Sequence, residues 1–379
     1  MNNTQKQFID ILSSGIRGKD IEKGYENVDW EQIINLAIEN KVEGIVYSSL
    51  HKSSLVSVVG EKRINLLKQK AEDAEIEQLR KISELSVVIK KINKENIPLI
   101  ILKGLAIRNF YPKAEQRTMG NANILVHRED VKKVKKLLID MRYSVLEEHN
   151  KIPHHITLIH NNYPTIKIHW NLFDGHGFAK EIIHYEKLIW KRAKNVNLDD
   201  VEILSFSYED LASHLCMYMA EHLTENGFEV RQLCDITILV EKLGNEIDWN
   251  SFIMKARMHG FEKFSLILFL ICNELFDMKL PEELEVKYVN NKKYLEALID
   301  EIFESKLKSK KVITNQFAKQ VSFSLDRYSY AKNIKILTPI AWIHHIFELI
   351  FNSGHNFKDL IKVKGKGIHR SKLIDWMEL

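Results

Sequence analysis

The segment at residues 97–126 most constrains the fold, because it alone sets two strand patterns beside turn residues and clustered polar side chains. The apolar run at 99–102 has the length of a buried strand and stops at Lys103-Gly104, where a helical pattern begins. A strand that enters a helix through a glycine turn presents free backbone N–H groups, and the neighbouring lysine adds positive charge. The turn is therefore predicted to hold a phosphate.

A second strand is predicted at 121–126, shortly after Arg117. Side chains alternate between the two faces of a strand, so Asn121 and Asn123 should lie on the same face. Two amide side chains then point toward one place. The segment predicts a polar site formed by one turn and one strand.

The composition is that of an ordinary globular protein, because 45% of the 379 residues are hydrophobic and support a sizeable core. The 55 basic and 51 acidic residues leave a formal charge of only +4, so nucleic acid is not predicted as a partner. Cys216, Cys234 and Cys272 are widely spaced in apolar surroundings, which predicts reduced core thiols. We find no leader pattern and no membrane-length apolar run, and expect a cytoplasmic protein.

Helical periodicity dominates the rest of the chain. The predicted helices are 4–14, 29–50, 61–93, 128–141, 207–223, 229–243, 249–258, 260–276, 293–306, 313–332 and 337–352. Further strands are predicted at 143–146, 155–159 and 165–170, and a loosely held basic segment at 358–372. This pattern predicts an α+β fold in four parts: N-terminal helices at 1–94, an α/β core at 95–205, a helical domain at 206–355 and a basic tail at 356–379.

Three blocks of residues share a pattern with a known family. They are Leu102-Lys103-Gly104 with Tyr111, then Arg117 and Met119 before Ile124-Leu125-Val126, then Ile168-His169-Trp170. They resemble the uncharacterised nucleotidyltransferases of the polymerase-β-like superfamily. The resemblance extends over about residues 30–275 through Leu204-Ser205, Glu209-Asp210-Leu211, His214, His222, Arg231, Cys234-Asp235 and Asp248-Trp249. It implies a nucleotidyltransferase-like mixed-sheet core flanked by helices.

The chain departs from the family at its three carboxylates. Asn121 and Asn123 stand where the family has paired aspartates, and Lys167 stands where it has the third acid. In the resembled family these acids hold two Mg²⁺ ions that activate an acceptor hydroxyl and neutralise the triphosphate. Mg²⁺ prefers charged oxygen ligands, so the three catalytic positions are predicted to be degenerate and to bind metal poorly. We predict no metal site, and Mg²⁺ and a nucleoside triphosphate as cofactors only if the chain is active.

The same substitutions create positive charge, which an anionic ligand can use in place of a metal. Lys103, Gly104, Arg117 and His169 are predicted to bind nucleotide or phosphate. Alternatively, Asn121 and Asn123 are plain polar residues in a vestigial cleft.

Five other histidines lie in the same region as His169, namely His154, His155, His160, His176 and His184. They lack the spacing of a metal site and are expected to be structural. His214, Tyr218 and His222 fall on one helix face, where Glu221, Arg231 and Asp235 are close in sequence. This face is predicted to form a polar network closing the cleft, with a second metal site as the alternative.

Two functions from different classes follow. The first is a degenerate nucleotidyltransferase, a pseudoenzyme, that binds a nucleotide, another anionic small molecule, a peptide or a biosynthetic partner protein. The second is an active enzyme that transfers a nucleotidyl group to a small molecule or peptide through a non-standard site. The sequence does not decide whether the protein is an enzyme, and Mg²⁺-dependent release of pyrophosphate separates the two.

Overall fold

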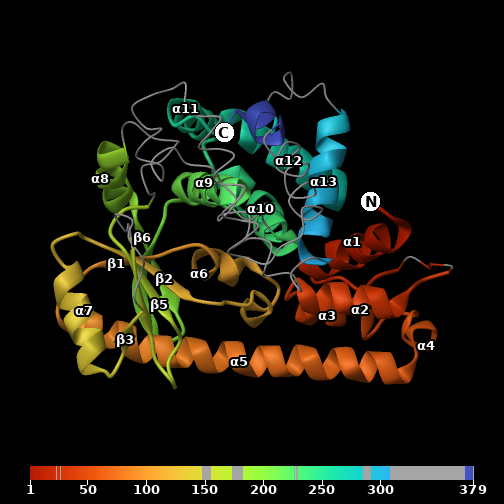
Figure 1. Ribbon diagram of the computed structural model, residues 1–379, viewed down its shortest axis with the longest axis horizontal. Coiled ribbons are helices and arrows are strands. Elements are labelled where there is room, and N and C mark those ends of the chain that lie inside the picture. Colours follow the sequence, from red (N-terminus) through yellow and green to blue (C-terminus); the bar gives the residue numbers. More distant parts are fainter. Residues whose placement is uncertain are drawn as a thin grey trace, which may run out of the picture.

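The computed structural model describes residues 1–22, 24–25, 27–146, 155–172, 182–225, 227, 229–284, 292–307 and 372–378 (Figure 1). The predicted helices 313–332 and 337–352 lie outside these residues, as do His154, His176 and most of the predicted basic tail. None of the described helices combines the length and the apolar character that crossing a membrane requires.

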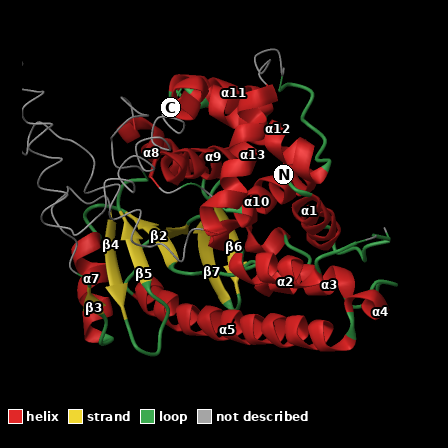
Figure 2. Ribbon diagram, turned by 45° about the vertical axis from the view of Figure 1, so that its right-hand side comes forward, coloured by secondary structure: helices red, strands yellow, loops and turns green. Residues whose placement is uncertain are grey.

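Within the described chain, seven strands form one mixed sheet in the order β3-β4-β5-β2-β1-β7-β6. Their bounds are β1 Leu99–Ile101, β2 Ala122–Val126, β3 Ser144–Val145, β4 His155–Ile159, β5 Ile166–His169, β6 Lys194–Leu198 and β7 Val201–Ser205. The central strand β2 pairs with β1 antiparallel and with β5 parallel, whereas β1 pairs with β7 parallel. The two predicted strands at 97–102 and 121–126 are therefore direct neighbours at the middle of the sheet, whose strands are yellow in Figure 2.

Five helices form the described N-terminal part of the chain: α2, α3 and α4 pack along the long helix α5, and α1 packs on α2 and α3 (Figure 1). They are α1 Asn3–Ile16, α2 Trp30–Glu39, α3 Glu43–Leu50, α4 Val56–Val59 and α5 Glu61–Lys94. The prediction of one helix at 29–50 is wrong, because α2 ends at Glu39 and α3 begins at Glu43. Lys41 between them has φ 55°, a left-handed conformation that ends a helix, and the Val42 N–H donates back to the Ala37 carbonyl at 2.9 Å.

Short helices connect the strands, and a helical layer follows the sheet. The connecting elements are α6 Gly104–Ile107, η1 Arg108–Phe110, η2 Ala114–Gln116, α7 Val131–Asp140 and α8 Ile182–Arg192. The helical layer comprises α9 Tyr208–Glu225, α10 Val230–Leu243, η3 Gly244–Glu246, α11 Trp249–Met258, α12 Glu262–Phe276 and α13 Lys292–Leu307. The predicted α+β class is confirmed. The exact domain boundaries stay a prediction.

One hydrophobic core runs through the helices and the sheet and includes the three cysteines, which are free and buried as predicted. A buried ion cluster fixes the end of α8 to helices α9 and α11. The Arg192 guanidinium donates to both carboxylate oxygens of fully buried Asp210 at 2.8 Å, and Lys255 of α11 donates to the same group at 3.0 Å. Burial acts to raise the pKa of Asp210, and these two cations hold it below its usual range.

The sequence reading missed the hairpin of β6 and β7, together with α8. The hairpin reverses direction at Asp199, which has φ 56°, and its two strands pair from Lys194↔Ser205 to Leu198↔Val201. Asn and Asp tolerate the left-handed region better than most residues, so the Asp199-Asp200 pair was the available turn signal. Because β7 pairs with β1, this hairpin extends the sheet beyond the strand that leads into the candidate site.

Candidate functional site

The predicted phosphate turn lies where β1 ends and α6 begins. Lys103 occupies the turn with φ 58° and ψ −132°, a region that suits glycine rather than a residue with a side chain. The turn is held on both sides, because the Leu102 N–H donates to the Asn123 carbonyl and the Ala106 N–H donates to the Lys103 carbonyl, each at 3.0 Å. These bonds place the strained lysine directly beside β2.

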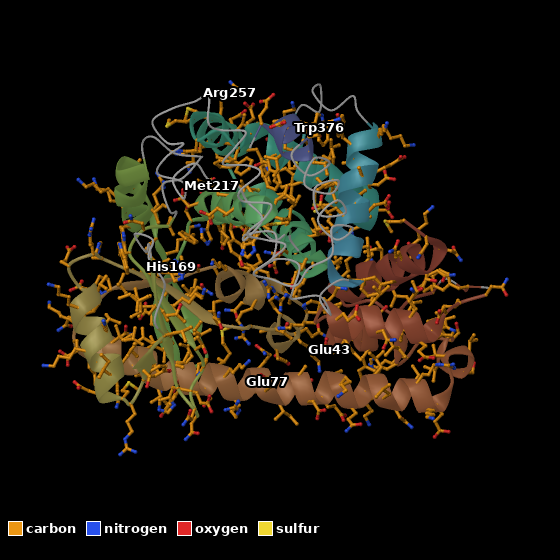
Figure 3. All side chains as sticks on the ribbon, viewed as in Figure 1. Glu43, Glu77, His169, Met217, Arg257 and Trp376 are labelled. Carbon is orange, nitrogen blue, oxygen red and sulfur yellow. The ribbon has the colours of Figure 1, made fainter. Side chains whose placement is uncertain are left out.

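The structure brings the positions of the family's acids together. Asn123 on β2 pairs in register with Lys167 on the parallel strand β5, and Asn121 lies exposed just before β2. The Asn123 amide donates to the Asn121 carbonyl at 3.1 Å, and its oxygen lies 3.0 Å from His169 Nε2. The amide oxygen can only accept, so His169 carries its proton on Nε2 in this arrangement. His169 lies toward the upper end of the sheet in Figure 3.

The Lys103 side chain turns toward α9 and toward Lys167. Its ammonium lies 4.2 Å from the centre of the Tyr218 ring, a cation–π contact that favours the charged form. Burial and the positive charge of Lys167 act the other way and lower the pKa of Lys103 to about 8, although Glu221 partly opposes them. Two ammonium groups therefore share one region at one end of the central strands.

Arg117 lies beneath the turn rather than free beside it. Its guanidinium forms a bidentate pair with Asp235 of α10, with both N···O distances 2.6 Å and only 7% of the arginine side chain exposed. Tyr111 donates to the same carboxylate at 2.7 Å. A Cβ added to Gly104 would lie 2.8 Å from this guanidinium, so a glycine is required where the turn rests on Arg117. Direct phosphate contact by Arg117 stays a prediction, and the geometry favours a supporting role.

Of the residues predicted to form a polar network, Arg231 and Asp235 belong to the next helix, α10, and bond to the segment before β2. There, Asp235 holds Arg117, and Arg231 donates to the Thr118 carbonyl at 2.9 Å and to its hydroxyl at 2.7 Å. Burial and the charge of Arg117 lower the pKa of Arg231. Both helical-layer residues thus bind the segment that leads into β2.

Tyr218 contacts Lys103 and Asp235 binds Arg117, but neither residue was among those predicted to bind the ligand or metal. The spacing of His214, Tyr218 and His222 on one helix face is the sequence feature that points to Tyr218. The structure stacks Tyr218 against His214, with ring centres 6.4 Å apart, and sets it edge-on to His222 at 4.3 Å. Burial and the nearby charge of Lys103 lower the pKa of His214 to about 3, so this histidine is neutral.

The sequence places the chain in a family. Residues 26–277 match the family described as uncharacterised nucleotidyltransferase, and this span is more than half of the chain. The protein belongs to that family. The resemblance identified from the sequence is thereby confirmed, and the mixed sheet with its flanking helices is this member's version of a nucleotidyltransferase-like fold.

Solved structures show only distant likeness. The antibiotic-resistance factor ANT(2'')-Ia is 10% identical over 48% of this chain and 92% of its own, with a TM-score of 0.35. The lincosamide antibiotic adenylyltransferase LnuA, solved with lincomycin, is 17% identical over 41% and 94%, with a TM-score of 0.30. A nucleotidyltransferase-like antigen of Paracoccidioides brasiliensis is 10% identical over 53% and 94%, with a TM-score of 0.32. No curated protein matches the sequence.

The residues at the acid positions of this family member do not fit Mg²⁺. The Asn123 oxygen accepts from His169, its nitrogen donates to the Asn121 carbonyl, and the neighbouring strand presents the Lys167 ammonium. A hard dication requires several charged or free oxygen ligands, and a cation alongside repels it. Among the described residues, no group of three or more histidine, cysteine, aspartate or glutamate side chains could hold a metal.

The other histidines of the described sheet region have structural contacts. His160 Nδ1 accepts from the backbone N–H groups of Asn162 and Tyr163, at 2.9 and 3.1 Å, and so holds the turn between β4 and β5. The rings of His155 and His169 lie 5.0 Å apart on neighbouring strands. These positions support the structural roles expected for His155 and His160. The side chain of His184 lies outside the described residues.

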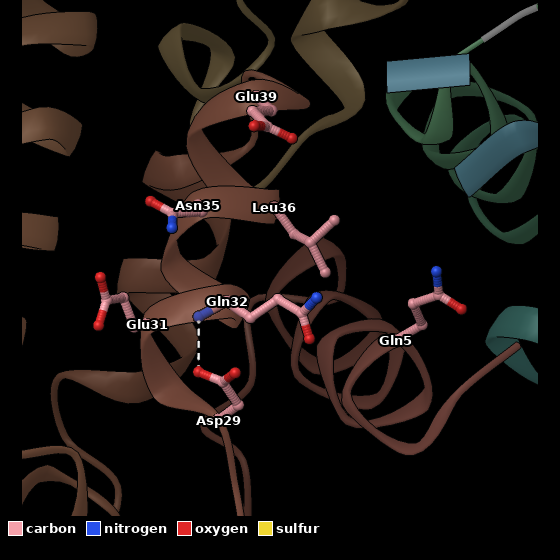
Figure 4. A pocket seen from close by; sticks show the side chains of 7 residues that line it. All are labelled: Gln5, Asp29, Glu31, Gln32, Asn35, Leu36 and Glu39. Carbon is pink, nitrogen blue, oxygen red and sulfur yellow. Dashed lines mark hydrogen bonds between the residues drawn. The ribbon is translucent and has the colours of Figure 1, made fainter. Parts of the chain in front are cut away.

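A separate hollow lies between α1 and α2 (Figure 4) and has a volume of about 310 Å³. It is lined by Gln5, Asp29, Glu31, Gln32, Asn35, Leu36 and Glu39. Asp29 is engaged there as the cap of α2, accepting from the Gln32 N–H at 3.0 Å. The hollow contains none of the predicted site residues, and its acidic lining is unsuited to a phosphate.

The conformation of Lys103 predicts a cost in stability. A side chain at this φ and ψ costs about 1–3 kcal/mol, whereas glycine adopts the conformation readily. Lys103→Gly is therefore expected to raise the free energy of unfolding by about 1 kcal/mol relative to Lys103→Ala, which keeps the strain. Denaturant unfolding measures the difference, and equal stability of the two variants would contradict backbone strain at this turn.

Proposed function

We propose that this protein is a degenerate nucleotidyltransferase that binds a nucleotide or a related anionic small molecule without metal. One observation carries the proposal: Lys103 follows the residue that bonds to Asn123, and Lys167 pairs in register with Asn123, so two ammonium groups lie at the same end of the central strands. The Glu221 carboxylate only partly offsets their repulsion at Lys103. Like charges that share a partly buried region repel each other, and an anion between them removes the repulsion.

The hydrogen-bonding groups around the two lysines suit such a ligand. Asn121 is exposed, Asn123 is partly buried, and both lie within the segment that flanks Lys167. Amide side chains donate and accept, which serves a sugar hydroxyl as well as a phosphate oxygen. Gly104 begins α6, whose first N–H groups extend the donor set next to Lys103. The turn thus combines backbone donors with positive charge.

Titration with ATP and with GTP in EDTA tests the proposal. We expect saturable binding without metal, weakened by added salt because the attraction is between charges. Lys103→Met and Lys167→Met should each weaken binding by about 1.5–3 kcal/mol, the usual contribution of a charge-assisted hydrogen bond. Lys132→Met is the matched control, because it removes the same charge from the exposed face of α7. Calorimetry gives the nucleotide affinities of the unmodified protein and of the three variants.

Two results would count against this function. Equal affinity of the control and the two site variants would place nucleotide binding elsewhere, and no saturable binding at millimolar nucleotide would make the site vestigial. The alternative, an active enzyme, predicts Mg²⁺-dependent pyrophosphate release in the presence of an acceptor. Neither a biosynthetic partner protein nor a peptide acceptor is required by the contacts described above.

A further inference from the structure

We propose that Lys103 is a nucleophilic amine that condenses with the aldehyde or ketone group of small anionic compounds, while Lys167 holds the anion. This proposal rests on the proposed anion site and adds a covalent step to it. It differs from phosphate binding, because a lysine that only binds an anion acts as an ammonium, whereas a nucleophile must lose its proton.

The geometry restrains the amine of Lys103. The strained turn fixes the start of its side chain, and the Tyr218 ring lies 4.2 Å from the nitrogen at the other end. A lysine normally has four flexible bonds and a fully hydrated head group. Here the head group lies against an aromatic ring, beside the strand that carries Lys167.

The charged groups facing this amine come from three elements. Lys167 of β5 disfavours the ammonium, Glu221 of α9 favours it, and Arg117 lies behind Gly104 with its charge paired to Asp235. The Tyr218 ring also favours the ammonium. His214, the buried histidine on the same helix, is neutral and adds no charge.

Together these groups shift the protonation of Lys103. Burial and the second lysine outweigh Glu221 and lower the pKa to about 8. An exposed lysine has a pKa near 10.4, so the neutral fraction of Lys103 at neutral pH is roughly 200-fold larger. Desolvation next to another cation is a known way to activate a lysine for imine formation. The amine is therefore available where the anion of a substrate would be held.

The reaction needs no oxidant or metal. The Lys103 nitrogen lone pair attacks the carbonyl carbon, the carbonyl oxygen takes a proton, and a carbinolamine forms. The nitrogen loses its proton and the hydroxyl leaves as water, which gives an imine. Amine and carbonyl compound thus become imine and water, with no change in oxidation state.

Pyridoxal 5′-phosphate is a suitable probe, because it carries an aldehyde and a phosphate. The full-length protein is treated with a limiting amount, reduced with borohydride to trap imines as secondary amines, and mapped by peptide mass spectrometry. We expect Lys103 to be labelled at least about 10-fold faster than Lys132, because far more of it is neutral. The rate at Lys103 should rise with pH and level off above about pH 8, where the amine is already deprotonated.

Two comparisons separate the roles of the two lysines. Lys167→Met should slow labelling by pyridoxal 5′-phosphate more than labelling by pyridoxal, which lacks the phosphate. Lys103→Arg should abolish the fast adduct while leaving the slow labelling of Lys132 unchanged, and that residual labelling confirms intact protein. A Lys103 rate no faster than that of Lys132, or one still climbing at pH 10, would overturn the proposal.

The ATP titration distinguishes this inference from the proposed function. Saturable ATP binding in EDTA with no adduct at Lys103 rejects the nucleophile and leaves the anion site standing. A fast Lys103 adduct with no ATP binding supports the nucleophile and rejects a nucleotide as the anion. Protection of Lys103 by ATP would support both, because the two ligands would then compete for one site.

Discussion

Asp235→Asn is expected to lower the free energy of unfolding by about 3–5 kcal/mol, because it leaves the buried Arg117 guanidinium without its counter-ion. Both partners are almost fully buried, and burial by itself would lower the pKa of Arg117. The Asp235 carboxylate outweighs that effect and raises the pKa above its ordinary value. The variant removes the compensation and keeps the cation. Denaturant unfolding measures the loss.

A double-mutant cycle separates the ion pair from plain packing. Arg117→Met combined with Asp235→Asn removes both charges, so the double variant should be less destabilised than the sum of the singles by about 1–3 kcal/mol. Asp235→Asn should also weaken nucleotide binding in EDTA, because Arg117 supports the turn at Gly104. A single-variant loss below about 1 kcal/mol would show that the pair contributes little to the fold.

The local part of the site follows from the sequence. A strand alternates its side chains, so Asn121 and Asn123 could be assigned to one face, and an apolar run that stops at Lys103-Gly104 marks a strand end. The structure places Asn123 in register with Lys167 and beside the turn, as strands joined in one sheet allow. Short-range periodicity carries enough information for such features.

Contacts between residues far apart in the sequence do not follow from short-range periodicity. Arg117 and Asp235 are separated by 118 positions, and the sequence contains many other acids that could have paired with Arg117. Arg117 was therefore assigned to a phosphate, although the fold buries it beneath the turn. The break at Lys41 and the reversal at Asp199 depend on positive φ at residues other than glycine, which tertiary contacts select and local propensity does not.

Replacing Asn121, Asn123 and Lys167 together by aspartate is expected to reverse the metal dependence of ligand binding. The change removes one positive charge and adds three negative ones at a single region of the sheet. Three carboxylates supply the charged oxygens that Mg²⁺ prefers. The triple variant should bind Mg²⁺ in calorimetry and should bind ATP only when Mg²⁺ is present, whereas the unmodified protein should bind ATP in EDTA.

The matched control is the variant with all three positions changed to leucine, which removes the polar groups without adding carboxylates. It should bind neither Mg²⁺ nor ATP. Tight Mg²⁺ binding by the unmodified protein would refute the argument, because Asn123 is engaged by His169 and Lys167 repels a cation. If the aspartate variant also releases pyrophosphate, the remaining scaffold positions a triphosphate for transfer.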